Sequence, residues 1–293
     1  MKKVYMLLIC SWLIMACKKQ VPIHFPEEAS RPVLSLLMEK DSILVARLTR
    51  SARAVFANKF PQITDATIQL YEDGQFRENL TMFEKYEYVF YKSTVKVKAG
   101  STYRLVAKIP GYGDLEGSDY IPAPVNVGEL SVNPIPGSKG HQSGEIKARI
   151  SVQIHDKGGE RNYYRIRIYI PYYYKDPDGT LYTEKYPTSF TTGNPQDTWF
   201  DAKQRDQFFI EDALFDGGSP RFNLVIDRWN KVNEAIVEVT ALTADSYKYL
   251  YSTAMAEEKN DDPLSEKVVV FNNIKNGYGI VGGMLQQLYS VKP

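Results

Sequence analysis

EIKARISVQI, residues 145–154, is the stretch of this 293-residue chain that decides its fold class. Apolar side chains occupy every second position from Ile146 to Ile154, and polar side chains occupy the positions between them. Successive side chains of a strand lie on opposite faces, so this alternation predicts a strand with one packed face and one wet face. Such strands are typical of antiparallel sheets, because parallel sheets are covered on both faces.

The same alternation recurs along the chain. It predicts further strands over 65–71, 102–109, 163–170, 222–226 and 235–241. In the strand over 163–170 the pattern assigns Arg165 and Tyr169 to the wet face. In the strand over 235–241 it assigns Glu238 and Thr240 to the wet face. One segment instead has helical spacing, with Tyr247, Leu250 and Tyr251 on one side of a helix that begins near Asp245.

These elements predict a mainly β fold: an N-terminal immunoglobulin-like β-sandwich followed by a second antiparallel β domain with one short helix. The stretch from 121 to 144 is rich in proline and glycine, which is typical of a connection between domains. We therefore expect the sandwich over 31–127, a Pro/Gly-rich junction over 128–144 and the second β domain over 145–293.

The composition excludes several classes of protein. Lys and Arg number 36 against 35 Asp and Glu, so the chain has no basic excess for nucleic acid. With 43% hydrophobic and 24% charged residues, it has the composition of a globular chain. Tyrosine is in excess, with 21 residues against 13 Phe and 3 Trp. A tyrosine combines an apolar ring with a polar end, which suits sheets that have a solvated face.

Residues 1–17 have the features of a lipoprotein signal peptide and lipobox. Lys2 and Lys3 precede a short apolar segment that ends in IMAC at residues 14–17. In bacterial lipoproteins the sulfur of such a cysteine takes a diacylglycerol, and the new N-terminus is usually acylated as well. Two acyl chains anchor a protein stably, so we expect a membrane anchor on Cys17. The alternative is an ordinary secretory signal in which Cys17 occurs by chance.

Processing at Cys17 has further consequences. Cys10 is removed with the signal, which leaves Cys17 as the single cysteine and excludes an intramolecular disulfide, a thiol nucleophile and Cys-ligated zinc. Residues 18–30 contain Pro22 and Pro26 and are expected to form an extended tether. No G-x-S-x-G, H-E-x-x-H, Walker or C-x-x-C motif occurs. We therefore predict no catalytic residue, no metal site and no cofactor.

Two groups of residues outside these motifs have alternative interpretations. His155, Asp212 and Asp216 give a hydrolase hypothesis, which requires that the three side chains converge in one cleft; otherwise they are turn and capping groups. The C-terminal part contains a candidate ordered loop after a strand predicted over 267–271. Its glycines and asparagines tolerate the left-handed backbone region, so the loop is either a tight structural turn or a ligand-facing surface. The loop residues are Asn273, Asn276, Gly277 and Gly279.

A run of tyrosines provides the candidate interaction surface. Residues 169–174 read YIPYYY, and a period of two cannot bury all of these rings. Exposed tyrosines suit contacts with a protein, a peptide or a glycan. The alternative is partial burial of the rings against the junction between the domains. The candidate surface comprises Tyr163, Tyr169, Tyr172, Tyr173 and Tyr174.

Several segments resemble a lipoprotein family known as domain of unknown function 4249. The resemblance covers residues 31 to 283 and is carried by ITDATIQL at 63–70, VKAGSTYRL at 97–105, IEDALFDG at 210–217 and NIKNGYGIVG at 273–282. The family usually has Phe where this chain has Leu264 and Val281, and Pro where it has Lys267. The resemblance implies a β-sandwich lipoprotein of the outer membrane, typically encoded beside a TonB-dependent receptor. It implies no enzymatic residues.

Together these observations lead us to expect a non-enzymatic lipoprotein of the cell outer membrane, attached through Cys17 on either the periplasmic or the surface face. We expect it to be an accessory or binding subunit of a TonB-dependent nutrient receptor. The alternative is a surface adhesin or carbohydrate-binding lipoprotein, in which exposed tyrosine rings stack on sugars. A peptide or glycan ligand is compatible with either function, and nucleic acid is not an expected partner.

Overall fold

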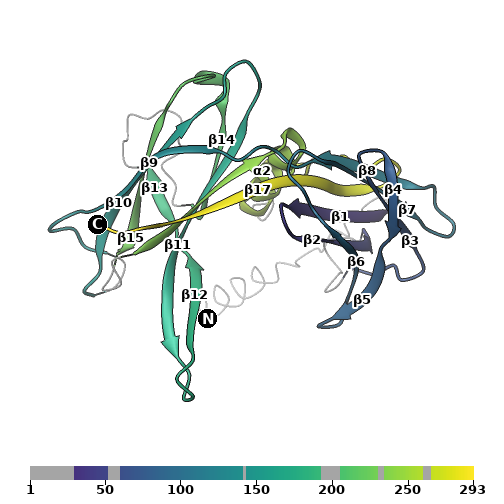
Figure 1. Ribbon diagram of the computed structural model, residues 1–293, viewed down its shortest axis with the longest axis horizontal. Coiled ribbons are helices and arrows are strands. Elements are labelled where there is room, and N and C mark those ends of the chain that lie inside the picture. Colours follow the sequence, from purple (N-terminus) through teal and green to yellow (C-terminus); the bar gives the residue numbers. More distant parts are fainter. Residues whose placement is uncertain (1–29, 52–59, 141–142, 193–204, 230–233, 260–264) are drawn as a thin grey trace, which may run out of the picture. The chain divides into compact units, whose positions relative to one another are not determined.

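The computed structural model describes residues 30–51, 60–140, 143–192, 205–229, 234–259 and 265–293 (Figure 1). Within these ranges the chain forms 17 strands in three sheets, with one α-helix and one short 3₁₀ helix. The prediction of a mainly β fold with one helix is confirmed. None of the helices in these ranges is both long enough and apolar enough to cross a membrane. The lipobox, Cys17 and the tether lie outside the described residues.

The largest sheet has nine strands. Eight of them lie side by side in the order β12 (Leu181–Pro187), β11 (Tyr163–Lys175), β16 (Ala235–Leu242), β17 (Tyr278–Val291), β1 (Pro32–Glu39), β2 (Ile43–Arg50), β6 (Tyr88–Lys96) and β5 (Thr81–Lys85). The ninth strand, β14 (Gln207–Glu211), pairs with the first half of β11.

The two smaller sheets have four strands each. One has the order β13 (Phe190–Thr192), β15 (Arg221–Trp229), β10 (Ile146–His155) and β9 (Asn126–Pro134). The other has the order β4 (Gln75–Asn79), β3 (Thr67–Glu72), β7 (Thr102–Lys108) and β8 (Leu115–Tyr120). The alternating face of β10 is buried as predicted, because Ala148, Ile150 and Val152 are fully inaccessible.

Strand β17 connects the two parts of the chain that the sequence assigns to separate domains. Its first half pairs with β1, from Tyr278 opposite Val33, and its second half pairs with β16, as far as Val291 opposite Ala235. The pairing with β1 is parallel, unlike the antiparallel pattern that the alternation predicts. Strands from both sides of residues 128–144 therefore share one sheet, and Arg31–Pro293 forms one compact unit. The first part of the expected junction is itself strand, because β9 pairs with β10.

The prediction of a wet outer face on β11 and β16 is wrong. Arg165 and Tyr169 are each 6% exposed, Glu238 is 1% exposed and Thr240 is inaccessible. The buried polar groups on this face bind one another. Arg165 forms an ion pair with Glu238 at 2.9 Å, and the Tyr169 hydroxyl donates a hydrogen bond to the same carboxylate at 2.8 Å. Alternation in the sequence marks these positions as polar, but it does not reveal that polar partners across the sheet satisfy them.

The α-helix, α2 (Ala244–Lys259), begins where the sequence predicts it. Thr243 caps it, because its hydroxyl accepts a hydrogen bond from the Ser246 amide at 3.2 Å. The ring of Tyr247 stacks on Tyr163 of β11, with the ring centroids 4.8 Å apart, so the helix covers this end of the sheet. This contact also contributes to the burial of the face that the sequence assigns to water.

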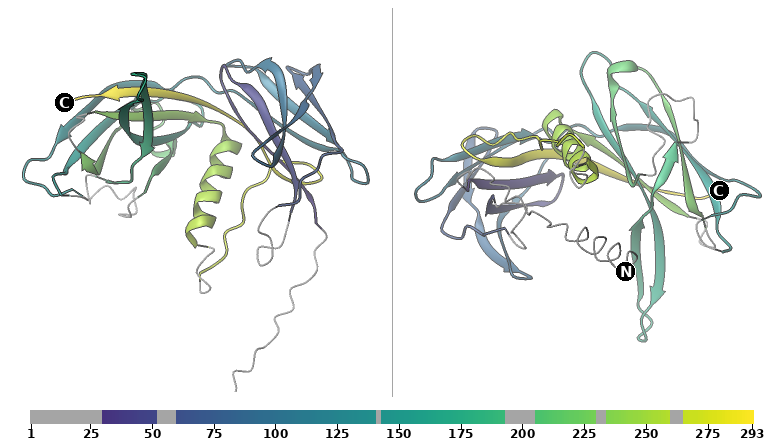
Figure 2. Two further views of the ribbon diagram at one scale, coloured as in Figure 1. Left: turned by 90° about the horizontal axis from the view of Figure 1, so that it is seen from below. Right: turned by 180° about the vertical axis from the view of Figure 1, so that it is seen from behind.

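The prediction of a strand over 267–271 is wrong. The segment runs back along α2 without pairing to a strand (Figure 2). The amide of Phe271 donates a hydrogen bond to the Ser252 hydroxyl of the helix at 2.9 Å. This amide is therefore bonded to a helix side chain and not to the backbone of a neighbouring strand. The Val269 side chain is 87% exposed, which explains why an apolar run here does not form a buried strand.

Candidate functional site

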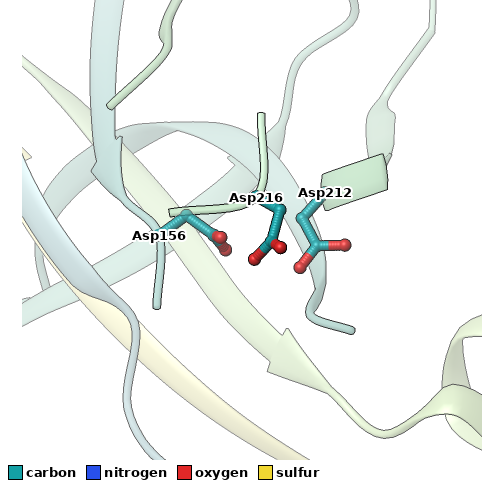
Figure 3. Close-up of side chains that lie close together, drawn as sticks. All are labelled: Asp156, Asp212 and Asp216. Atoms are coloured by element: carbon teal, nitrogen blue, oxygen red, sulfur yellow. The ribbon is translucent and has the colours of Figure 1, made fainter. Parts of the chain in front are cut away.

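Three carboxylates from two loops that are far apart in the sequence lie together at one end of the β10–β15 sheet. Asp156 follows β10, Asp212 begins the 3₁₀ helix η1 (Asp212–Leu214), and Asp216 follows that helix. One carboxylate oxygen from each residue lies within 4.8 Å of the other two (Figure 3). The loop after β10 and the loop around η1 thus form a carboxylate cluster, which we define as Asp156, Asp212 and Asp216.

Each carboxylate of this cluster already accepts hydrogen bonds from the opposite loop or from a nearby strand. Asp212, only 1% exposed, accepts from the Asn162 amide at 2.7 Å and from its side-chain nitrogen at 3.1 Å. Asp216 accepts from the Gly159 amide at 2.8 Å. The cluster therefore fastens the two loops together.

Asp156 serves the same purpose. It accepts from the Gly217 amide at 2.8 Å and from the Tyr164 hydroxyl. Burial, and then the hydrogen bond to Asp156, raise the pKa of Tyr164, so this phenol stays protonated and acts as a donor. Three carboxylates are the oxygen donors that hard cations such as calcium prefer. In this cluster, however, those oxygens already accept bonds from loop amides and side chains.

His155 does not join the carboxylates. Its ring nitrogen Nδ1 is 2.8 Å from the Ser219 hydroxyl, and the residue is exposed at the end of β10. Asp212 and Asp216 converge, but the histidine that the hydrolase hypothesis requires as their partner does not lie with them. The arrangement on which that hypothesis depends is therefore not formed. Asp156, which the sequence hypothesis left out, takes the third place in the cluster.

A cavity of about 640 Å³ lies beside the cluster, between the β8–β9 connection and the β10–β11 turn. One wall is apolar and includes Ile121 and Leu242, which are almost completely buried. The other side carries polar groups from 155–163. Asp156 and Tyr164 belong to both the cavity lining and the loop-fastening network. This size falls within the range of small-molecule sites.

The connection that forms the apolar wall is held at several points. The Gly100 amide donates to the Ile121 carbonyl at 3.1 Å, and the Val125 amide donates to the Gln287 side chain at 2.7 Å. The Tyr120 carbonyl packs so closely on Gly283 of β17 that a Cβ there would lie 1.8 Å from it. A glycine is therefore required at 283 for the connection to lie in this position.

The five tyrosines of the predicted interaction surface occupy three environments. Tyr172 and Tyr173 are 56% and 43% exposed, and Tyr174 is half-buried on the same strand. Tyr163 is half-buried against α2. Tyr169 is buried, and its hydroxyl donates to Glu238. The exposed part of the surface thus belongs to the end of β11, where it pairs with β12.

Strand β12 extends this surface in a way that the sequence interpretation missed. All seven residues of β12 are exposed, and the β11–β12 hairpin projects from the rest of the described unit (Figure 1). In the pairing of β11 with β12, Tyr174 lies opposite Tyr182, and Ile170 lies opposite Tyr186. Two features of the sequence could have predicted this second strand. They are the alternation in LYTEKY at 181–186 and the turn DPDG at 176–179 before it.

Four tyrosines share one face of this hairpin, and we call them the tyrosine ladder. Neighbouring rings are 5.4 to 6.4 Å apart between centroids. The Glu184 carboxylate lies among them and accepts from the Tyr174 hydroxyl at 3.2 Å and from the Tyr186 hydroxyl. The members of the ladder are Tyr172, Tyr174, Tyr182 and Tyr186.

The predicted ordered loop is held against neighbouring parts of the protein. The Asn273 side chain accepts from the Val281 amide at 3.0 Å and donates to the Val281 carbonyl at 2.9 Å. Asn276 has a φ of 60° and donates to the Asp114 carbonyl at 2.9 Å. At Gly277 an added Cβ would lie 2.8 Å from the Pro32 carbonyl, and at Gly279 one would lie 2.0 Å from the Leu34 carbonyl. These contacts support the structural interpretation of the loop.

Comparison with known proteins identifies a family for this chain. No curated protein matches the chain. Among solved structures, the similar ones include two of Salmonella alpha-2-macroglobulin, the Y1175G mutant and the form reacted with methylamine, each 10% identical. The matches cover 94% and 91% of this chain but only 16% and 15% of those chains, with TM-scores of 0.23 and 0.25. Residues 21–289 match the family model described as Domain of unknown function (DUF4249), and the chain therefore belongs to this family.

Proposed function

We propose that this protein is a non-enzymatic lipoprotein of the bacterial outer membrane, anchored through Cys17, that serves as an accessory subunit of a TonB-dependent nutrient receptor. The lipobox at 14–17 supports the anchor, and the resemblance to the family supports the receptor. The observation that carries the proposal is the exposed tyrosine ladder on the β11–β12 hairpin.

The hairpin has the properties of a docking element. A two-stranded ribbon exposed on both faces is marginally stable in water, so contact with a partner would stabilise it. Tyr172 and Tyr186 are 56% and 54% exposed, which leaves large apolar ring surfaces available for contact. Tyrosines are enriched among the residues that dominate protein interfaces.

The ladder is also ordered before any partner binds. The stacked rings of Tyr174 and Tyr182 and the hydrogen bonds to Glu184 hold the side chains in place. Fixing side chains costs roughly 0.5–1.5 kcal/mol each on association, so a ladder that is already ordered avoids part of that cost. This supports a protein-binding role for the hairpin.

The test is affinity purification of the tagged, full-length lipoprotein from detergent-solubilised outer membranes of its own cell, with the bound proteins identified by mass spectrometry. We expect a TonB-dependent receptor with the unaltered protein. The double variant Tyr172→Ser/Tyr186→Ser is expected to lose the receptor. Tyr86→Ser is the matched control, because Tyr86 is 83% exposed on a different hairpin.

Two outcomes would contradict the proposal. If no TonB-dependent receptor co-purifies with the unaltered protein, the assignment as a receptor subunit is wrong. If the receptor is retained by the hairpin double variant, the receptor contact lies elsewhere and the tyrosine ladder is not the docking element. Thermal unfolding of each variant verifies that the substitutions leave the fold intact.

A second candidate function is a surface adhesin or carbohydrate-binding lipoprotein. The cavity beside the carboxylate cluster favours it, because the lining combines tyrosine rings with polar side chains. A glycan array with the full-length protein tests this function. Absence of any glycan signal would count against it.

A further inference from the structure

We propose that the cavity between the β8–β9 connection and the β10–β11 turn is a binding site for a neutral saccharide. The proposal deepens the second candidate function and is independent of the receptor and of the tyrosine ladder.

The first argument is the pair of rings at the cavity. Tyr120 comes from the end of β8 and is 49% exposed, whereas Tyr163 comes from the start of β11 and is half-buried. Burial, followed by the charges of Asp119 and Glu160 and by Tyr163, raises the pKa of Tyr120. Both tyrosines line the cavity. An aromatic ring with a polar end matches a sugar, which has an apolar C–H face and a rim of hydroxyl groups.

The second argument is the availability of polar groups. Within the described residues, the hydroxyls of Tyr120 and Tyr163 have no hydrogen-bond partner in the protein. The Asn162 side-chain nitrogen donates to the Lys157 and Glu160 carbonyls, at 3.0 and 2.9 Å, which fixes the orientation of its amide. Hydroxyl groups of a ligand can both donate to and accept from the two free phenols.

The third argument concerns charge. Lys157 forms an ion pair with Glu160 at 2.7 Å, and Arg161 forms one with Glu211. The Asp156 carboxylate accepts from Tyr164 and from the Gly217 amide. Lys157 and Arg161 are therefore already paired with protein carboxylates, and an anionic ligand would have to displace one of those carboxylates. A neutral ligand has no such cost.

The fourth argument is rigidity. The apolar wall is fixed by backbone hydrogen bonds at Ile121 and by the close packing of the Tyr120 carbonyl on Gly283. The opposite side is fixed by the carboxylate cluster, which fastens the turn at 156–162 to the loop around η1. A site whose two sides are both fixed loses little conformational entropy on binding, which benefits a ligand with few apolar contacts.

The test uses the purified full-length protein in a detergent without a sugar headgroup. A glycan array identifies neutral oligosaccharides that bind, and isothermal titration calorimetry measures the dissociation constant of the strongest. We expect Tyr120→Ala to weaken binding by about tenfold or more, because it removes a stacking ring. Tyr120→Phe keeps the ring and is expected to weaken binding less than Tyr120→Ala does.

Two control variants separate this proposal from the others. Arg221→Gln removes a charge that is paired with Glu129 outside the cavity lining, and it is expected to leave the binding of a neutral oligosaccharide within about threefold. Tyr172→Ser/Tyr186→Ser alters the hairpin and is expected to leave saccharide binding unchanged. Loss of the receptor in the hairpin variant together with retained saccharide binding would support both proposals separately.

Three results would overturn the inference. The first is that no neutral oligosaccharide binds the full-length protein. The second is that a uronate-containing oligosaccharide binds more tightly than its neutral counterpart and loses that affinity with Arg161→Gln. The third is that the hairpin variant abolishes saccharide binding while Tyr120→Ala, verified as folded by circular dichroism, leaves it intact.

Discussion

The Arg165 guanidinium and the Glu238 carboxylate lie 2.9 Å apart on neighbouring strands, and both side chains are almost completely buried. Burial alone would raise the pKa of Glu238, but Arg165 holds it below its usual value. The Tyr169 hydroxyl at 2.8 Å and the Thr240 hydroxyl at 3.0 Å contribute to the same effect. The result is a buried polar network across the neighbouring strands β11 and β16 of the largest sheet.

Breaking this pair on one side is expected to destabilise the protein strongly. Arg165→Met leaves the Glu238 charge buried without its partner, at a cost of about 3–5 kcal/mol in the free energy of unfolding. The double variant Arg165→Met/Glu238→Leu is expected to cost less than the sum of the two single variants, because neither charge remains. Denaturant unfolding of the three variants measures both quantities.

A surface pair supplies the control for this comparison. Arg221 and Glu129 form an ion pair with side chains 45% and 59% exposed. Arg221→Met is expected to cost about 1 kcal/mol or less, because exposed pairs contribute little. Equal losses from Arg165→Met and Arg221→Met would contradict the role assigned to the buried network.

Asp119 is expected to make stability depend on pH. Burial raises the pKa of its carboxyl to about 6 from its ordinary value of 3.8, although Thr243, the Gly283 amide and the Tyr120 amide donate to it. The folded state therefore holds a proton that the unfolded state has released, and stability falls as the pH rises through this window. The loss amounts to at most about 3 kcal/mol.

Unfolding free energies measured by denaturant between pH 4 and pH 7 test this prediction for Asp119. In Asp119→Asn the contribution of this group to the pH slope is expected to vanish, whatever the change in overall stability. Identical slopes in the variant and the unaltered protein would show that Asp119 is not the group responsible.

Gly279 is expected to be intolerant of any side chain. Its φ of 116° is in a region that other residues rarely adopt, and an added Cβ would lie 2.0 Å from the Leu34 carbonyl of the parallel partner strand. Gly279→Ala is therefore expected to cost roughly 3 kcal/mol or more in the free energy of unfolding. Gly137→Ala is the matched control, since Gly137 has a φ of 72° but nothing within 4 Å of an added Cβ. It is expected to cost about 1 kcal/mol, from backbone strain alone.

The proposed lipid anchor predicts that removal of the Cys17 thiol alone releases the protein from the membrane. Cys17→Ser is expected to abolish incorporation of a radiolabelled fatty acid and to release the protein from the membrane fraction, because the sulfur that takes the lipid is absent. Cys10 lies within the signal segment, so Cys10→Ser is expected to leave both the fatty-acid labelling and the membrane association unchanged. Continued labelling of Cys17→Ser would refute the lipoprotein assignment.

The sequence predicts the positions of individual strands better than it predicts which strands are neighbours and which polar side chains are buried. The alternation in 145–154 gives β10 with its buried face, since each apolar position depends only on strand geometry. The same reasoning fails for Arg165, because its burial depends on its ion pair with Glu238 of another strand. The order of the strands cannot be predicted for the same reason. No pattern within β17 or β1 indicates that the two strands pair in parallel.

The candidate site depends on the same long-range effects. The sequence singles out Asp212 and Asp216, and the structure brings them together with Asp156. It also singles out Tyr172, which is exposed as expected. The cavity could not be predicted, because the two tyrosines that line it, Tyr120 and Tyr163, come from separate sheets.

The position of β17 also sets the order in which the protein can fold. This strand is the last of the described strands in the sequence, yet it lies between β1 and β16 at the middle of the largest sheet. During synthesis, neither of those strands can pair with β17 until residues 278–291 have been made. Until then, each exposes an unpaired edge of the kind that leads to aggregation. Protection of these two edges until β17 has been made would therefore favour correct folding of the chain.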